Sequence, residues 1–265
     1  MKGMKSDKIL NRERRKTDYF KIKKIPDFIK NIGVQKERSL HHQIKKWYYK
    51  TGDKIEHKLN KYFIDIVRGD LLIEIQTGNF SAVKSKLNNL LTSYKIRLVY
   101  PLAVEKWISK IKGADVISRR KSPKTGKIHD IFKELIHIRE IVKHPNFSLE
   151  ILLIAEEEER KDDGKGSWRR KGVSITDRKL IEVKRSIILK SIDDYTIFVP
   201  ESLKQPYSNK EYAQILKISK YYAQKINYTL ARMNVIKCIG KKKNEILYHN
   251  AVTLPTNYDL KITDK

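Results

Sequence analysis

The chain has a single cysteine, Cys238, and no long uncharged apolar stretch. One thiol cannot form a disulfide within the chain. The seven histidines are scattered along the sequence, so we expect no structural zinc site. The apolar runs fall far short of the roughly 20 residues that a membrane-spanning helix needs, and the amino terminus lacks the apolar core of a signal peptide. We therefore expect a soluble intracellular protein, cytoplasmic or associated with the nucleoid, with no membrane partner.

Acidic residues are scarce relative to basic ones. The 265 residues include 58 Lys and Arg against 31 Asp and Glu, which leaves a formal net charge of +27. Such an imbalance favours a polyanionic partner, because each phosphate that the protein neutralises releases counterions and adds affinity. A lysine-rich surface that reflects genome composition or heat adaptation is the alternative explanation. The charge indicates DNA as the partner and does not separate DNA from RNA.

The composition changes along the chain and divides it into four parts. Residues 1–36 are dense in Lys and Arg with irregular apolar spacing, which predicts a basic arm or a solvated tail. Residues 37–200 carry helix and strand patterns, with a β-rich elaboration from about residue 112. Residues 201–250 predict a small module of helices and a hairpin, and residues 251–265 predict a tail.

The first half of the large domain contains alternating helix and strand patterns. A helix begins at Ser39, and a second helix begins at Ser81 and leads to the apolar run Ile96–Tyr100. Between the helices lie three strand patterns: Lys54–Leu59, Tyr62–Val67 and Leu71–Gln76. These three are expected to be antiparallel, while the second helix allows the next strand to pair in parallel. The pattern predicts an α/β (α+β) fold with a mixed sheet flanked by helices.

Three acid or amide groups lie along the second and third strand patterns. Alternation places Asp65 on one face of its strand and puts Glu74 and Gln76 together on one face of the next. A bend at the turn residues Gly69 and Asp70 would bring these groups together. Carboxylate and amide oxygens are hard ligands that suit Mg²⁺, with Mn²⁺ as a substitute. In a chain this basic, we expect such a metal to act on a phosphodiester.

The pattern Asp65…Glu74-x-Gln76 resembles that of the PD-(D/E)xK, or restriction-endonuclease-like, nuclease superfamily. The resemblance covers about residues 39–100 and implies a metal-dependent DNA endonuclease with Asp65 and Glu74 as ligands. Ile64 stands where the superfamily often has Pro, and Gln76 stands where it usually has Lys. A glutamine can orient the attacking water through a hydrogen bond, but it carries no charge and cannot act as a base at neutral pH.

Two other functions stay open alongside the endonuclease. One is a catalytically inactive DNA-binding or regulatory protein on the same fold, and the other is an RNA-directed nuclease. A homodimer would suit an enzyme that cuts both strands of a duplex, although nothing in the sequence identifies a dimer interface.

Three further side chains are candidates for the same site. Glu56, on the preceding strand, can supply a third carboxylate or form a surface ion pair. His41, on the first helix, can hold a metal-bound water or a phosphate, or can be an ordinary surface histidine. Lys84, one turn beyond Ser81, can contact the scissile phosphate or be solvated.

The middle of the chain predicts a helix and further strands around a basic loop. Ile131–Val142 is expected to be a helix, followed by three strand patterns: Phe147–Glu158, Val173–Ile175 and Leu180–Leu189. The acids Glu156–Glu159 are expected to form a charged strand end that faces the loop containing Arg169 and Arg170. The loop places cations around Trp168, and both arginines are candidates for nucleic-acid binding.

The last part of the chain has the pattern of a winged helix. Ser208 and Glu211 predict a capping box that opens a helix, and Ser219 is expected to cap a second helix that ends at Met233. Two strand patterns then flank a cationic hairpin tip. The residues expected to bind nucleic acid are Lys220, Gln224 and Lys225 of the second helix and Lys241, Lys242 and Lys243 of the tip. A role in protein contacts is the alternative.

Overall fold

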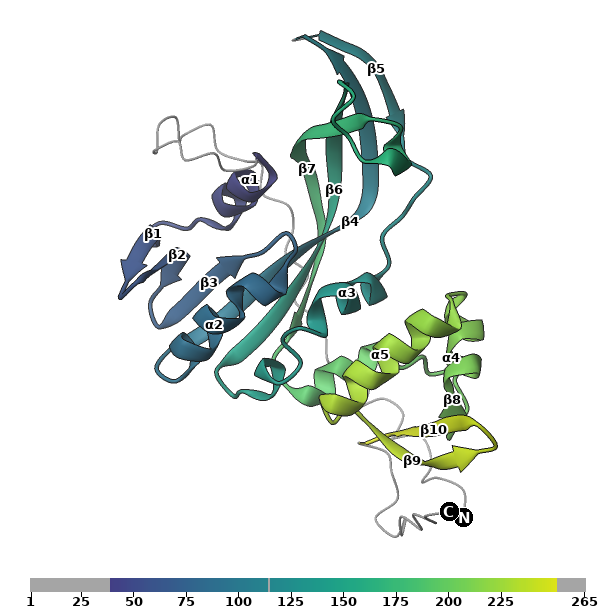
Figure 1. Ribbon diagram of the computed structural model, residues 1–265. Helices are drawn as coiled ribbons and strands as arrows, with labels where there is room; N and C mark the ends of the chain where they lie inside the picture. The colour runs from purple at the N-terminus through teal and green to yellow at the C-terminus, as the bar shows by residue number, and fades with distance from the viewer. Residues whose placement is uncertain (1–38, 114, 252–265) are drawn as a thin grey trace, which may run out of the picture.

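The computed structural model describes residues 39–113 and 115–251 (Figure 1). The basic arm predicted at residues 1–36 lies outside this part of the chain, and so does the predicted tail at 251–265 except for its first residue. Within it, a mixed sheet carries helices on both faces, which confirms the predicted α/β (α+β) class.

The central sheet has seven strands in the order β1–β2–β3–β4–β6–β7, with β5 paired to β4. Strands β1, β2 and β3 are antiparallel, β4 is parallel to both β3 and β6, and β7 is antiparallel to β6. The sheet is therefore mixed, as predicted. Its strands are β1 (Lys54–Leu59), β2 (Tyr62–Arg68), β3 (Leu71–Ile75), β4 (Lys95–Lys112), β5 (Asp115–Lys121), β6 (Phe147–Asp162) and β7 (Val173–Leu189).

Helices α1 (Ser39–Tyr48) and α2 (Phe80–Leu91) cover opposite faces of the sheet. The apolar stripe of α1 packs on Ile73 of β3, whereas that of α2 packs on the neighbouring Leu72. Successive strand residues point to opposite faces, so each helix buries a different set of side chains. Because α2 connects β3 to β4 and crosses the sheet between them, the two strands run parallel as predicted.

The predicted helix Ile131–Val142 is wrong. The segment is divided among η1 (Ile128–Ile131), α3 (Phe132–Leu135) and η2 (Ile141–Lys143). Its buried side chains include Phe132, Leu135, Ile138 and Ile141, which recur every three residues. A repeat of three matches the 3₁₀ geometry better than the 3.6 residues per turn of an α-helix, so short turns bury this segment more completely.

Strands β4, β6 and β7 are longer than predicted. Strand β7 runs without a break through the two predicted segments, and three bulges disturb the alternation that would have shown one strand. Strand β4 continues beyond Tyr100 for twelve residues, so the elaboration begins within this strand rather than near residue 112. Beyond the end of β3, these strands and β5 project as an arm (Figure 1). We call this the β-arm.

Glu156–Glu159 do not form a charged strand end that faces the Arg169 loop. They lie within β6, where Glu156 and Glu158 are buried. Lys106 Nζ lies 2.8 Å from Glu156 Oε1 and 3.1 Å from Glu158 Oε2, and Arg160 Nη2 lies 2.6 Å from Glu158 Oε1. Alternation along β6 places these groups on one face, where cations of β6 itself and of the adjacent β4 neutralise the acids.

The last part of the chain forms two helices and a three-stranded sheet in the order β8–β10–β9, the arrangement expected of a winged helix. Ser208 and Glu211 make the predicted capping box, and Ser219 Oγ caps the second helix by accepting from Tyr222 N at 3.2 Å. The elements are β8 (Tyr207–Ser208), α4 (Asn209–Leu216), α5 (Lys220–Arg232), β9 (Ile236–Lys242) and β10 (Glu245–Asn250).

This carboxy-terminal module packs directly on the sheet domain. Its buried side chains belong to the same apolar cluster as those of α2, α3 and β4. Tyr212 Oη donates a hydrogen bond to the carbonyl oxygen of Phe198 in η4 (Ile192–Phe198), and Tyr222 Oη donates to that of His129, each at 2.7 Å. One continuous core therefore holds α5 in a defined position relative to the sheet.

Candidate active site

Asp65 and Glu74 lie beside each other where β2 and β3 separate. The ladder between these strands ends at the pair Ile66 and Ile73, and the next residues in register are the two acids. Asp65 Oδ2 accepts a hydrogen bond from the backbone N–H of Ile75 at 2.8 Å. The carboxylate thus takes the place of a backbone partner, and the hairpin brings the two acids together at the end of β3.

Two basic side chains of α1 approach Asp65. His41 Nε2 lies 3.2 Å from Asp65 Oδ2 and 2.9 Å from the carbonyl oxygen of Ile75, and Lys45 Nζ lies 3.6 Å from Asp65 Oδ1. Burial acts to raise the pKa of Asp65, but the hydrogen bond and charge of His41, the N–H of Ile75 and the Lys45 charge together lower it below its usual value. Asp65 is consequently an ionised carboxylate at neutral pH.

Glu56 joins this group through Lys45. The Lys45 ammonium lies 2.8 Å from Glu56 Oε1. Lys45 itself is buried, with only 4% of its surface exposed. Glu56 lies between two paired residues of β1, Ile55 and His57, and has a φ of 49°, which is uncommon for a residue other than glycine. Its side chain is still 45% exposed. Glu56 therefore lies at the open edge of the site, while Asp65 lies inside it.

Glu74 is the most perturbed acid of the site. Its Oε1 accepts a hydrogen bond at 2.7 Å from Lys86 of α2, whose ammonium also donates to the carbonyl oxygen of Phe63. Its Oε2 is buried and has no hydrogen-bond partner among the described residues. Burial and the negative charge of Asp65 raise the pKa of Glu74 to about 7, although Lys86 and His41 oppose this shift.

Gln76 turns its amide toward the loop that leads into α2. Gln76 Nε2 donates a hydrogen bond at 2.5 Å to the carbonyl oxygen of Gly78. Glu134 of α3 accepts from the backbone N–H of Phe80 at 2.9 Å and so satisfies the first turn of α2. The Gln76 amide nitrogen therefore binds the turn before α2. The cation next to Glu74 is Lys86, which belongs to α2.

Sequence reasoning missed Lys45 and Lys86, which contribute the two ammonium groups nearest the acids. Lys86 follows Val83 by three residues and precedes Leu90 by four, which places it at the border of the apolar face of α2. Lys45 likewise follows the buried Ile44. A lysine that borders an apolar helix face was the available signal, because its long stem can reach across to a neighbouring strand.

The other predicted binding residues lie apart from this group of acids. Lys84 is exposed on α2, two residues before Lys86 and on a different side of the helix. Arg169 and Arg170 lie on the β-arm loop, and the remaining six lie on the carboxy-terminal module. Of those six, Gln224 and the hairpin cations are exposed, Lys225 is half-buried, and Lys220 Nζ lies 2.9 Å from Glu245 Oε1.

Within residues 39–113 and 115–251, no three His, Cys, Asp or Glu side chains gather closely enough to hold a metal ion by themselves. In the same residues, none of the helices has the length and apolar character needed to cross a membrane.

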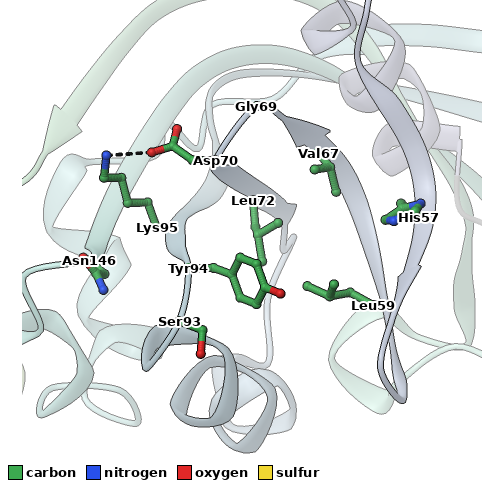
Figure 2. A pocket seen from close by; sticks show the side chains of 10 residues that line it. All are labelled: His57, Leu59, Val67, Gly69, Asp70, Leu72, Ser93, Tyr94, Lys95 and Asn146. Atoms are coloured by element: carbon green, nitrogen blue, oxygen red, sulfur yellow. Dashed lines mark hydrogen bonds and ion pairs between the residues drawn. The ribbon is translucent and has the colours of Figure 1, made fainter.

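A separate cavity of about 370 Å³ lies at the opposite end of the β2–β3 hairpin (Figure 2). Asp70 lies at its rim and forms an ion pair with Lys95 at 2.7 Å, which agrees with its prediction as a turn residue. Neither Asp65 nor Glu74 lines this cavity. Its lining comes from β1, from the β2–β3 hairpin, from the turn between α2 and β4 with the first residue of β4, and from Asn146, so it is not part of the acidic site.

Comparisons with known proteins bear on the sheet domain. Residues 38–190 match the family model described as "Domain of unknown function (DUF8091)". The chain belongs to this family. The matched region contains the whole acidic site and the β-arm, and ends before the carboxy-terminal module.

A protein of Treponema pallidum (strain Nichols), described as an uncharacterized protein, is 33% identical to this chain over 158 residues. The aligned region covers 58% of this chain and 62% of that relative, which is less than two thirds of the relative's length. A comparison with solved structures gave no match.

Proposed function

We propose that this DUF8091 protein is a metal-dependent DNA endonuclease whose site is built on Asp65 and Glu74. One observation carries the proposal: Glu74 is held next to the ionised Asp65, its buried Oε2 has no hydrogen-bond partner among residues 39–113 and 115–251, and its pKa is raised to about 7. A buried pair of carboxylates is costly without a compensating cation. A divalent cation would relieve the repulsion and give Glu74 Oε2 a partner, so the residues present fit Mg²⁺ or Mn²⁺.

Asp65 and Glu74 would hold the ion, and solvent and phosphate oxygens would complete its coordination, because these two side chains are too few to enclose it. When bound, the ion supplies charge for the phosphodiester and lowers the pKa of water. Lys86 replaces the cation that the PD-(D/E)xK resemblance would expect at Gln76. Its ammonium is 2.7 Å from Glu74 Oε1, within reach of a phosphate bound next to that acid.

The charge distribution supports DNA as the substrate. The chain carries a net charge of +27, and the exposed cations of the module's hairpin lie on an element that can contact a duplex backbone. Because one core fixes α5 relative to the sheet, a duplex bound by the module would approach the acidic site in a defined orientation. Binding of this kind weakens steeply as the salt concentration rises.

A second candidate is a DNA-binding protein that does not cut. The ammonium groups of Lys45 and Lys86 already lie within ion-pair distance of the two acids, which favours a structural role for the cluster. In that case the protein would bind DNA without divalent metal, and Mg²⁺ or Mn²⁺ would cause no nicking.

Cleavage of supercoiled plasmid and of branched DNA tests the proposal. With Mn²⁺ or Mg²⁺, we expect the wild type to nick, and Asp65→Asn and Glu74→Gln to lower the rate about 100-fold or more. Asp70→Asn removes a carboxylate from the same hairpin, yet this residue is exposed and outside the site, so its rate should equal that of the wild type.

Metal binding gives a second measurement that does not depend on turnover. A cation at 100 times its Kd stabilises the folded state by about 2.7 kcal/mol, so Mn²⁺ should raise the melting temperature of the wild type and of Asp70→Asn but not of Glu74→Gln. A wild type that binds DNA but neither nicks it nor gains stability from Mn²⁺ would establish the non-catalytic candidate.

A further inference from the structure

The β-arm rises from the edge of the sheet at which the acidic site lies. Strand β3 ends at Ile75, beside Glu74, while the neighbouring β4 continues to Lys112 (Figure 1). Neither apolar cluster of the protein includes a residue of β6 beyond Ile154. Apart from the segment of β7 around Leu180, which packs against α1, the distal arm does not cover the core, and its position next to the acids makes it available to whatever binds there.

Ion pairs and polar contacts hold the distal β-arm together on both of its faces. On one face Glu158 is neutralised by Lys106 and Arg160. On the other, Arg119 of β5 contacts Glu157 at 3.2 Å, and its guanidinium lies 4.2 Å from the centroid of the half-buried Trp107 ring. The Trp107 ring is thus half-buried within the arm, and the Arg119 guanidinium covers one of its faces.

Trp168 lies in the loop between β6 and β7, and its surroundings differ from those of Trp107. Its side chain is 83% exposed, more than any other large hydrophobic side chain of the described residues. The guanidinium of the neighbouring Arg169 lies 5.6 Å from the centroid of its ring. Burying an indole lowers the free energy of the folded protein, and an exposed indole lacks this stabilisation. Where the backbone holds a tryptophan in an exposed position, the exposure indicates a surface that binds a ligand.

The loop backbone holds Trp168 in this exposed position. Gly166 N donates to the carbonyl oxygen of Gly172 at 2.8 Å, and Lys171 N donates to that of Trp168 at 2.9 Å. A Cβ at Gly166 would lie 1.9 Å from the carbonyl oxygen of Val173, so no side chain fits there. The loop is closed and internally hydrogen-bonded, and it presents the indole in a preorganised way, which lowers the entropy lost when a ligand binds.

The cations of the loop are also available. No carboxylate of the described residues forms an ion pair with Arg169, Arg170 or Lys171, and the acids Glu156–Glu159 of β6 pair with other cations. Arg169 and Lys171 are exposed, while Arg170 uses its Nε–H to hold the carbonyl oxygen of Val173. An exposed indole among unpaired cations matches a ligand that has both a flat aromatic face and a negative charge.

We propose that Trp168 is a stacking platform for an unpaired nucleobase and that the adjacent cations bind the phosphates flanking this base. Stacking on an exposed aromatic needs a free base face, which the interior of a duplex does not offer. The inference rests on the proposed function for its ligand class and narrows the substrate to DNA with a single-stranded segment, such as a fork, a flap or a frayed end.

Binding measured in EDTA tests this inference separately from cleavage. Dissociation constants would be compared for a single strand, a blunt duplex and a fork of the same sequence. We expect Trp168→Leu to weaken single-strand and fork binding about tenfold while changing duplex binding less than twofold. Trp168→Phe, which keeps an aromatic face, should restore most of the loss. Ile117→Ala removes an exposed apolar side chain from β5 of the same arm and should have no effect.

Three results would overturn the inference: equal weakening of single-strand and duplex binding by Trp168→Leu, no weakening at all, or a loss that Phe does not restore. Absence of nicking by the wild type, together with a Trp168-dependent preference for single strands, would reject the endonuclease and retain the stacking platform. If Trp168→Leu nicks a fork as fast as the wild type and binds it with the same affinity, the endonuclease is retained and the stacking platform is rejected.

Discussion

The protein buries glutamates on β6 and on β3, and Glu158 of the first set and Glu74 of the second have opposite surroundings. On β6, Glu158 is 2% exposed, and cations of β4 and β6 lie at 3.1 and 2.6 Å from its two oxygens. Burial acts to raise its pKa, but these cations outweigh burial and lower it. On β3, Glu74 is similarly buried, one of its oxygens has no partner among the described residues, and its pKa is raised to about 7.

The two acids differ in which protonation state their surroundings favour. A buried charge whose oxygens all have partners belongs to the packing of the arm, and its environment favours the charged form. A buried acid whose environment disfavours the charged form weakens the fold, and such perturbation is typical of functional sites. The same residue type therefore has two roles here, and its partners decide which.

The largest expected effect comes from Glu158→Gln. The substitution keeps the shape of the side chain but leaves the charges of Lys106 and Arg160 without this buried anion. Removing one partner of a buried pair typically costs about 3 kcal/mol or more. Chemical denaturation at pH 7 should show this loss of unfolding free energy. A loss below about 1 kcal/mol would show that the β6 acids do not stabilise the arm.

A smaller effect of opposite sign is expected for Glu74→Gln in the metal-free protein. Because the folded-state pKa of Glu74 is raised above its unfolded value of 4.5, the unfolded chain releases the proton first as the pH rises. The wild type therefore loses stability between about pH 4.5 and pH 7, and the variant does not. We expect the variant to be more stable by about 1 kcal/mol at pH 8, since the loss of an anion beside Lys86 offsets part of the gain.

Denaturation of both proteins in EDTA across pH 4 to 8 measures this difference. Wild type and variant should be nearly equally stable near pH 4, and their curves should separate as the pH rises. A variant that is less stable than the wild type at pH 8 would mean that Glu74 is an ordinary partner of Lys86, like the acids of β6.

Local patterns were enough to predict much of the fold and the acids of the site. Alternation and the Gly69-Asp70 turn placed Asp65 and Glu74 on adjacent strands, and the capping groups Ser208 and Ser219 set the starts of two helices. These features depend on neighbours a few residues away. The sequence therefore contains their signals in short windows.

The β-arm and the cations of the site could not be predicted in the same way. Both faces of the distal arm are polar and β7 is bulged, so the alternation of apolar residues that indicates a strand is absent there. Lys45 and Lys86 reach their acids from helices on opposite faces of the sheet. Such contacts depend on tertiary packing, and neither secondary-structure propensity nor residue spacing indicates which distant elements pack together.

The smallest expected effect comes from Asp70→Asn, a third acid that belongs to neither set. Its pair with Lys95 is 2.7 Å long, but both side chains are mostly exposed, at 74% and 64%. Exposed pairs contribute little because water screens them and ordering two side chains is unfavourable. The change in unfolding free energy should stay below about 0.5 kcal/mol, at both low and high salt. The contrast between Glu158 and Glu74 attributes the strength of an ion pair to burial and to the number of partners. A larger change for Asp70→Asn would contradict this and would mean that the distance between the charges alone predicts the strength of the pair.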